Sequence, residues 1–190
     1  MSGVVSHLST EELEAGLDHI RSAPQDAGTL ELIVRRPAVG IREELTKGDL
    51  DIEVGLVGDT WFKRRSRMTA DGSPHPLMQL NIMSSRVVAL VAQDRTRWAL
   101  AGDQLFVDFD LSEANAPAGT RLAIGEAIVE VTKQPHLGCG KFVERFGLDA
   151  MKFVNSPKGR ELNLRGINAR VVQPGPIRVG DAVRKLPAAD

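Results

Sequence analysis

The sequence contains few aromatic residues and only one cysteine. Tyr is absent and aromatic residues make up 4% of the 190 positions, which argues against a surface that stacks on nucleic-acid bases. The formal net charge is -1, so no overall positive field attracts nucleic acid or an anionic membrane. One cysteine cannot form a disulfide within the chain. We therefore expect neither nucleic acid nor a membrane as a partner.

Targeting and membrane-spanning patterns are also missing. The sequence does not open with a basic segment followed by an apolar core, as a secretory signal does. No apolar run approaches the ~20 residues that span a bilayer. Hydrophobic residues make up 42% and charged residues 26% of the chain, values typical of globular proteins. These patterns predict a cytoplasmic globular protein.

The first 28 residues differ from the rest of the chain. Ser9 and Glu12 have the spacing of a capping box, and Leu13, Leu17 and Ile20 mark one face of the helix that would follow. The neighbouring residues are polar. The pattern predicts a helical extension over residues 1–28 that decorates the main body, and a single larger domain over residues 29–186.

That larger domain consists mainly of short strands separated by Gly and Pro. Strands are expected over residues 29–36, 51–54, 77–82, 105–110, 121–124, 127–132, 167–172 and 177–186. Gly125-Glu126 would join one hairpin. Helices are expected after Ser84 and over residues 139–153, the latter interrupted near Gly147. The fold class is therefore mainly β with inserted helices, an antiparallel barrel or sandwich, because strand and helix alternate too irregularly for a doubly wound parallel sheet.

Cys139 occupies the start of a predicted helix, after a strand and a loop. Unpaired N–H groups and the helix dipole at such a position favour a thiolate, and Lys141 adds a positive charge. A reactive thiolate and a buried structural cysteine both fit this position. His136 could act as a base, contact an anion, or face solvent as an ordinary loop residue. The histidine spacing supports neither a protease triad nor a structural zinc site.

A basic cluster opens the long loop predicted over residues 61–76. Lys63, Arg64, Arg65 and Arg67 lie within five positions of one another. Such a cluster is either a solvated loop or a clamp for a phosphate-bearing ligand, because Arg can grip a phosphate with two parallel hydrogen bonds. Glycine-rich phosphate-binding motifs are absent from the sequence.

The C-terminal third resembles the MOSC family, which is named for the C-terminal domain of molybdenum-cofactor sulfurases. The resemblance covers about Thr29 to Leu186. The sequence differs from the family at His136, where the family has Arg, and at Gly138, where the family has Pro. A further difference is Gly102-Asp103-Gln104, where the family has Gly-Glu-Asn. The segments that carry the resemblance are Pro135-His136-Leu137-Gly138-Cys139-Gly140-Lys141, Arg165-Gly166-Ile167-Asn168-Ala169-Arg170-Val171-Val172-Gln173-Pro174-Gly175, the closing Ile177-Arg178-Val179-Gly180-Asp181-Ala182-Val183, and the early Arg36-Pro37 and Gly55-Leu56-Val57-Gly58-Asp59.

This resemblance implies a MOSC-type antiparallel β-barrel in which Cys139 carries a sulfane sulfur or ligates molybdenum in the molybdenum cofactor. It further implies a list of cofactor-binding residues: His136, Lys141, Arg165, Asn168, Arg64, Arg65 and Arg67. Pyridoxal phosphate is not expected, because the segment before Thr29 is too short for the desulfurase domain of sulfurases. A separate cysteine desulfurase or a redox partner would then be needed.

Two alternatives remain open for the function. One is a molybdenum-dependent reductase of N-hydroxylated compounds, in which Cys139 would be a permanent metal ligand. The other is a non-catalytic binding module with an inert cysteine. A homodimer is also conceivable, because the edges of many short strands could pair between chains.

Overall fold

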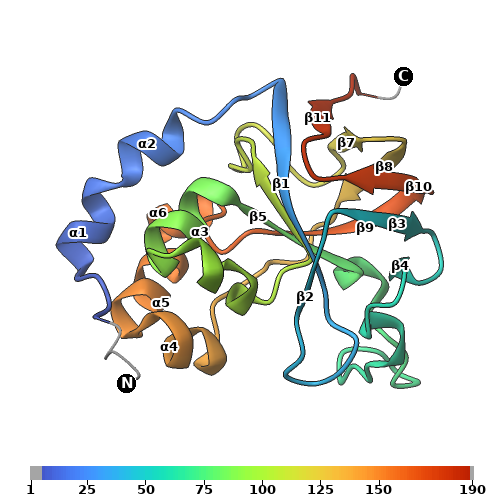
Figure 1. The fold of residues 1–190 in the computed structure, drawn as a ribbon, viewed down its shortest axis with the longest axis horizontal. Coiled ribbons are helices and arrows are strands. Elements are labelled where there is room, and N and C mark those ends of the chain that lie inside the picture. Colours follow the sequence, from blue (N-terminus) through green and yellow to red (C-terminus); the bar gives the residue numbers. More distant parts are fainter. Residues whose placement is uncertain (1–5, 189–190) are drawn as a thin grey trace.

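A closed β-barrel forms the body of the protein (Figure 1). The computed structural model describes residues 6–188. Seven strands close the barrel in the order β1, β11, β7, β8, β9, β5, β6 and back to β1. All of these pairs are antiparallel except β5 with β6. The predicted β-barrel is confirmed. Its strands are β1 (Ala27–Arg35), β5 (Leu80–Ser84), β6 (Leu105–Asp108), β7 (Arg121–Ile124), β8 (Ala127–Val131), β9 (Ile167–Gln173) and β11 (Ala182–Lys185).

Four shorter strands complete the β-structure. β2 (Glu43–Leu45) pairs with β1, and a separate sheet has the order β10 (Gly175–Arg178), β3 (Lys47–Asp51), β4 (Gly55–Leu56). The predicted strand over residues 51–54 is wrong. The Asp51 carboxylate accepts hydrogen bonds from the N–H groups of Glu53 and Val54 at 2.8 and 3.1 Å, which turns the chain from β3 into β4.

Another sequence prediction needs correction near the C-terminus. Residues 177–186 do not form one strand. The chain leaves β10 after Arg178 and begins β11 at Ala182, and Gly180 between them has a φ of +95°, a value that few other residues adopt. The predicted hairpin at Gly125-Glu126 is confirmed between β7 and β8.

The helices gather on one side of the barrel (Figure 1). The predicted capping box is confirmed, with Ser9 and Glu12 bonded to each other's backbone. The predicted interruption of the helix over residues 139–153 is also confirmed, because Gly147, with a φ of +90°, ends α4 and precedes the first residue of α5. The helices are α1 (Thr10–Ala15), α2 (Leu17–Arg21), α3 (Ser85–Ala92), α4 (Gly140–Phe146), α5 (Leu148–Asn155) and α6 (Pro157–Glu161), with 3-10 turns η1 (Trp61–Lys63), η2 (Pro76–Met78) and η3 (Arg95–Ala101). Among the described residues, no helix is both long and apolar enough to span a bilayer.

Two hydrophobic cores lie on the two faces of the barrel wall. Side chains alternate along a strand, so Ile33 of β1 enters the barrel interior while Leu32 and Val34 pack beneath the helices. Leu13 and Ile20 of the N-terminal helices are buried in this second core. The N-terminal helices therefore lie outside the barrel interior, and their apolar face shields the wall of the barrel from water.

Candidate functional site

Asn168 holds the segment that leads to Cys139. Its side chain is fully buried in β9, at one end of the barrel. The Nδ2 group donates to the carbonyl oxygens of Gln134 and Pro135 at 3.0 and 3.2 Å. Its Oδ1 accepts a hydrogen bond from Nδ2 of Asn81, which belongs to β5, at 2.7 Å. The side-chain amide of Asn168 therefore connects the segment that follows β8 to both β9 and β5.

A second amide holds the same segment four residues further on. Asn155, the last residue of α5, accepts from the N–H of Gly138 at 2.8 Å and donates to its carbonyl oxygen at 3.0 Å. The segment from Gln134 to Gly138 is therefore fixed at both ends by buried or half-buried amides. This fixes the backbone immediately before Cys139.

His136 lies between these two anchors and faces a buried carboxylate. Its Nδ1 is 3.4 Å from Oδ1 of Asp103, and neither atom has a hydrogen-bond partner among the described residues. Burial, together with the charges of Arg165 and Arg36, lowers the pKa of His136 well below its ordinary value of 6.5. The imidazole is therefore neutral at pH 7.

Asp103 and Arg165 form the ion pair behind this histidine. Nη1 of Arg165 donates to Oδ2 of Asp103 at 2.7 Å, and Nη2 donates to the carbonyl oxygen of Ala101 at 3.0 Å. The guanidinium also stands over the ring of Phe142 in α4, 5.1 Å from its centroid. Burial raises the pKa of Asp103, and the neighbouring Arg165 opposes that rise. We assign the ionised form to Asp103, because the guanidinium compensates the buried charge directly.

Arg36 extends this polar network across the end of the barrel. It follows β1, and its Nε and Nη2 donate to the two carboxylate oxygens of Asp59 at 2.7 and 2.8 Å. Nη1 donates to the carbonyl oxygen of Gly102 at 2.8 Å and to Oδ1 of Asn81 at 3.3 Å. Asn81 therefore links Arg36 to Asn168. The polar residues at the ends of β1, β5, β8 and β9 form one connected set.

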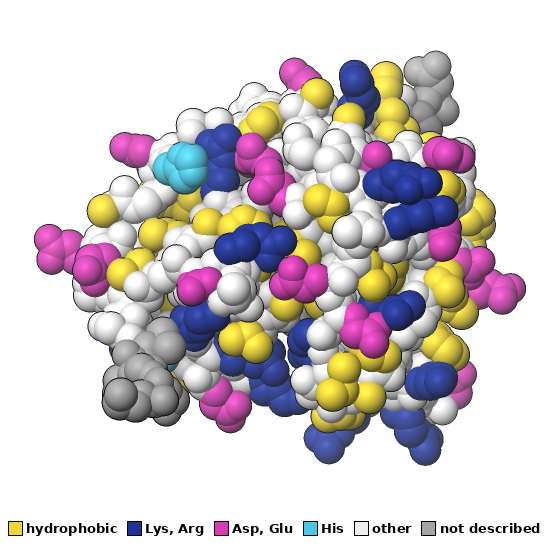
Figure 2. All heavy atoms as spheres, in the orientation of Figure 1, with side chains coloured by type: hydrophobic (Ala, Val, Ile, Leu, Met, Phe, Trp, Pro, Cys, Tyr) yellow, Lys and Arg dark blue, Asp and Glu magenta, His cyan; other side chains and the backbone are white. Residues whose placement is uncertain are grey.

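Arg42 and Arg145 lie beside Gly102, and Arg64 is close enough to Arg42 for their charges to interact; we call these three arginines the cationic cluster. Nη2 of Arg42 and Nη1 of Arg145 each lie 3.6 Å from the position that a Cβ would occupy on Gly102. Among the described residues, none of the three has a carboxylate partner. Figure 2 shows Lys and Arg side chains along the lower edge of this face, around α4 and the β1–β2 loop.

The pKa values of two arginines of the cluster are lowered, although the charge of Asp59 opposes the effect in both. Burial and the charges of Arg145 and Arg36 lower the pKa of Arg42, and burial with the charges of Arg36 and Arg42 lowers the pKa of Arg64. Nε of Arg42 is buried and has no hydrogen-bond partner among the described residues. Like charges held together without an acidic partner are the usual signature of a site for an anion.

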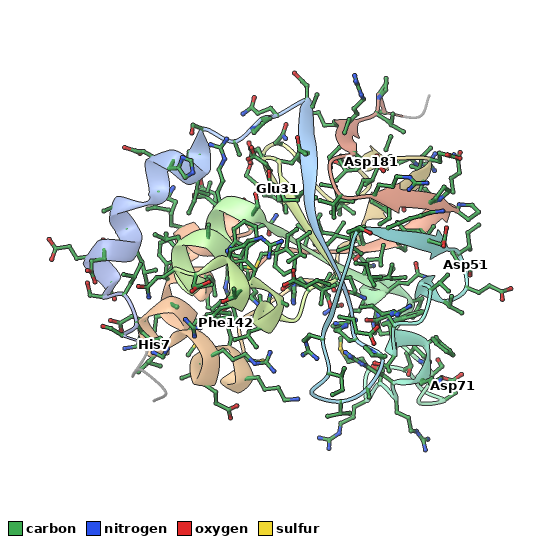
Figure 3. All side chains as sticks on the ribbon, in the orientation of Figure 1. His7, Glu31, Asp51, Asp71, Phe142 and Asp181 are labelled. Carbon is green, nitrogen blue, oxygen red and sulfur yellow. The ribbon has the colours of Figure 1, made fainter. Side chains whose placement is uncertain are left out.

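Cys139 itself is exposed at the start of α4, where the sequence placed it. Among the described residues its thiol makes no hydrogen bond, and the backbone is extended, with a φ of -128°. A Cβ built on the next residue, Gly140, would meet nothing within 4 Å, so the space beside this neighbour of Cys139 is open. Lys141 is exposed and forms no ion pair in the described part of the chain. Figure 3 labels Phe142, whose ring points from α4 into the core that supports this end of the helix.

The structure brings only part of the predicted site together. His136 and Arg165 meet at Asp103, Asn168 anchors the segment, and Arg64 joins the cationic cluster. Arg65 instead packs along Gly72 of its own loop, and Arg67 is exposed without an ion pair among the described residues. The sequence interpretation did not single out Arg36, Arg42, Asp59, Asn81, Asp103 or Arg145 as site residues. The Gly102-Asp103-Gln104 segment was a signal for Asp103.

The structure defines a class of protein: a closed β-barrel that presents one exposed thiol directly after the Gln134–Gly138 segment, which Asn168 and Asn155 hold in place, with the cationic cluster near the same end. The described residues contain no group of three or more His, Cys, Asp or Glu side chains placed to hold a metal ion. A family model for the MOSC domain matches residues 4–184. The chain belongs to the MOSC family.

Solved structures share this fold. The YuaD protein of Bacillus subtilis is similar with a TM-score of 0.58 and 19% identity, over 83% of this chain and 94% of that one. YiiM of Escherichia coli has a TM-score of 0.53 and 20% identity, over 85% and 71% of the two chains. YiiM of Geobacillus stearothermophilus has a TM-score of 0.51 and 13% identity, over 84% and 73%. None of the curated proteins matches the sequence.

Proposed function

We propose that this protein binds the molybdenum cofactor and that the Cys139 thiolate either ligates the molybdenum or accepts a sulfur atom. The observation that carries the proposal is the placement of Cys139: the single cysteine of the chain is exposed at the end of a segment that Asn168 and Asn155 hold in place. A thiolate is a soft donor suited to such a metal and is also the form that attacks sulfur. The MOSC family is associated with both kinds of chemistry.

The residues present fit the cofactor. The cationic cluster offers guanidinium groups without carboxylate partners, including the unpartnered Nε of Arg42, and these suit the phosphate of a pterin. The neutral His136 could hydrogen-bond a ring nitrogen or oxygen. Arg165 and Asn168 act as positioning residues, because their hydrogen bonds are used within the protein. When bound, the cofactor would supply two-electron redox chemistry at molybdenum.

Sulfur transfer would follow a balanced exchange. The Cys139 thiolate attacks the outer sulfur of a persulfide R–S–SH on a separate cysteine desulfurase. A new S–S bond forms to Cys139, the S–S bond of the donor breaks, and the donor leaves as the thiolate RS⁻. The product is a Cys139 persulfide that keeps the proton of the outer sulfur, with no net oxidation or reduction. The open space beside Gly140 would admit a second protein to this thiol.

The test is analysis of the purified protein from a host that makes the cofactor. Molybdenum, pterin and sulfane sulfur are each measured per chain for the wild type and for Cys139→Ser. A molybdenum ligand predicts near-stoichiometric molybdenum that falls strongly in C139S. A sulfur carrier predicts sulfane sulfur that C139S loses. Absence of all three from the wild type would overturn the proposal and favour the binding module with an inert cysteine.

The reductase alternative has its own outcome. Stoichiometric molybdenum together with reduction of an N-hydroxylated amidine by a chemical electron donor would assign Cys139 as a permanent metal ligand. Molybdenum without that activity would leave a cofactor-binding role.

A further inference from the structure

A cavity of about 340 Å³ lies between the Thr132–Leu137 segment and the chain that runs from α6 into β9. Its volume falls in the usual range for small-molecule sites, about 300–1,000 Å³. His136 and Leu137 line one side, and Val154, Arg160 and Arg165 line another. Neither Cys139 nor any member of the cationic cluster belongs to its lining. The cavity therefore adjoins the surface to which the cofactor is assigned, because His136, Arg165 and Asn168 of the candidate site also belong to its lining.

The walls of the cavity combine an apolar surface with an excess of positive charge. Leu137 and Val154 contribute apolar surface, while Lys133 and Arg160 are exposed cations of the lining. Among the described residues Lys133 forms no ion pair, and the guanidinium of Arg160 bonds only a carbonyl oxygen, that of Asn155, at 3.1 Å. One carboxylate, Glu113, belongs to the lining. An organic molecule with an apolar body and an anionic group complements such walls.

His136 gives the cavity a directed polar group. Its Nδ1 is turned to Asp103 at 3.4 Å, so Nε2, on the other side of the ring, is the nitrogen available to the cavity that His136 lines. The positive charges of Arg165 and Arg36 help to lower the pKa of this histidine. Both guanidiniums are paired with carboxylates, so the positive charge that favours an anion comes from Lys133 and Arg160 of the lining.

We propose that this cavity binds a small organic anion, whose acid group lies near Lys133 and Arg160 and whose body packs on Leu137 and Val154. A hydrogen-bonding group of the ligand reaches Nε2 of His136. Leu137 lies two residues before Cys139, so the bound anion contacts the segment that presents the thiol. The proposal does not depend on the cofactor.

The test uses the cofactor-free full-length protein with benzoate as the probe, and neutral benzamide and cationic benzylamine as matched compounds. Histidine ring signals are followed by NMR during each titration. Benzoate is expected to shift the His136 signals saturably, and benzamide and benzylamine to bind at least about tenfold more weakly. Equal binding of benzoate and benzamide, or no shift with benzoate at millimolar concentrations, would overturn the proposal.

Surface variants keep the test independent of folding and of Cys139. The double variant K133A/R160A is expected to weaken benzoate binding at least about tenfold. The control R178A/R184A, which removes two exposed cations from β10 and β11, is expected to leave it unchanged. Equal weakening in both variants would show a general charge effect and reject the site. C139S should retain benzoate binding, so failure of the cofactor proposal remains distinguishable from failure of this one.

Discussion

Arg36 and Asp59 form a two-point ion pair that solvent hardly reaches. The two contacts are 2.7 and 2.8 Å long, and the side chains are 5% and 0% exposed. Burial alone would raise the pKa of Asp59, but its hydrogen bonds to Arg36 and the charge of that residue outweigh burial and lower it. The pair fastens the chain that follows β1 to the loop that follows β4.

Breaking this pair on one side is predicted to be more damaging than replacing both partners. Asp59→Ala leaves a buried guanidinium without its counter-charge, and we expect a loss of about 3–5 kcal/mol in the free energy of unfolding. The double variant R36M/D59L should lose less, because no unpaired charge remains. Urea denaturation of both variants checks this, with E161A in the exposed Lys158–Glu161 pair as a control that should hardly change.

The same pair predicts acid sensitivity. The pKa of Asp59 is lower in the folded protein than its ordinary value of 3.8, so its stabilisation is fully present above that value and is lost as the pH falls through the folded value. The stability difference between wild type and R36M/D59L should therefore be smaller at pH 3 than at pH 7, and an equal difference at the two pH values would contradict this prediction.

His136 is predicted to make stability depend on pH below neutrality. Its folded pKa lies well below 6.5, so between the two values the unfolded chain binds more protons than the folded one. Stability should therefore fall by about 1.4 kcal/mol per pH unit as the pH drops below 6.5. His136→Gln should remove that part of the slope. Unfolding free energies between pH 7.5 and 5 measure it, and parallel curves for the two proteins would contradict the assignment.

Asn168 is predicted to control the order of the segment before Cys139. Asn168→Ala removes donors from two carbonyl oxygens and the acceptor of Asn81, with an expected loss of about 1–3 kcal/mol in the free energy of unfolding. Amide hydrogen exchange over residues 134–138 should become faster. Gln173→Ala, which removes an exposed hydrogen bond to the carbonyl oxygen of Glu126 at the other end of β9, serves as the control and should leave that exchange unchanged.

The cationic cluster is predicted to dominate cofactor retention. A hydrogen bond to a charged group contributes about 1.5–3 kcal/mol, so each of R42A and R145A should weaken binding about ten- to hundredfold. Molybdenum and pterin per chain measure the effect. R65A/R67A tests the arginines singled out from the sequence, and retention that falls with R65A/R67A but not with R42A would contradict this assignment.

Local patterns in the sequence were enough to predict much of the chain. The capping box at Ser9, the hairpin at Gly125-Glu126 and the helix break at Gly147 are each set by residues close in sequence. Cys139 was predicted at a helix start for the same reason. The strand over residues 51–54 was wrong because its alternation of charged and apolar residues also fits a turn, and the side chain of Asp51 decides between them.

The sequence by itself determined the strand-rich class, the helix starts and the position of the one thiol, because these depend on side-chain periodicity and on backbone preferences within a few residues. Only the tertiary structure decided that Arg36 pairs with Asp59, that His136 faces Asp103, and that Arg42 meets Arg145 beside Gly102. These partners are separated in sequence by 23, 33 and 103 positions. Closure of the barrel brings them together. Backbone and side-chain preferences within a few residues do not determine which distant charged groups are buried against each other.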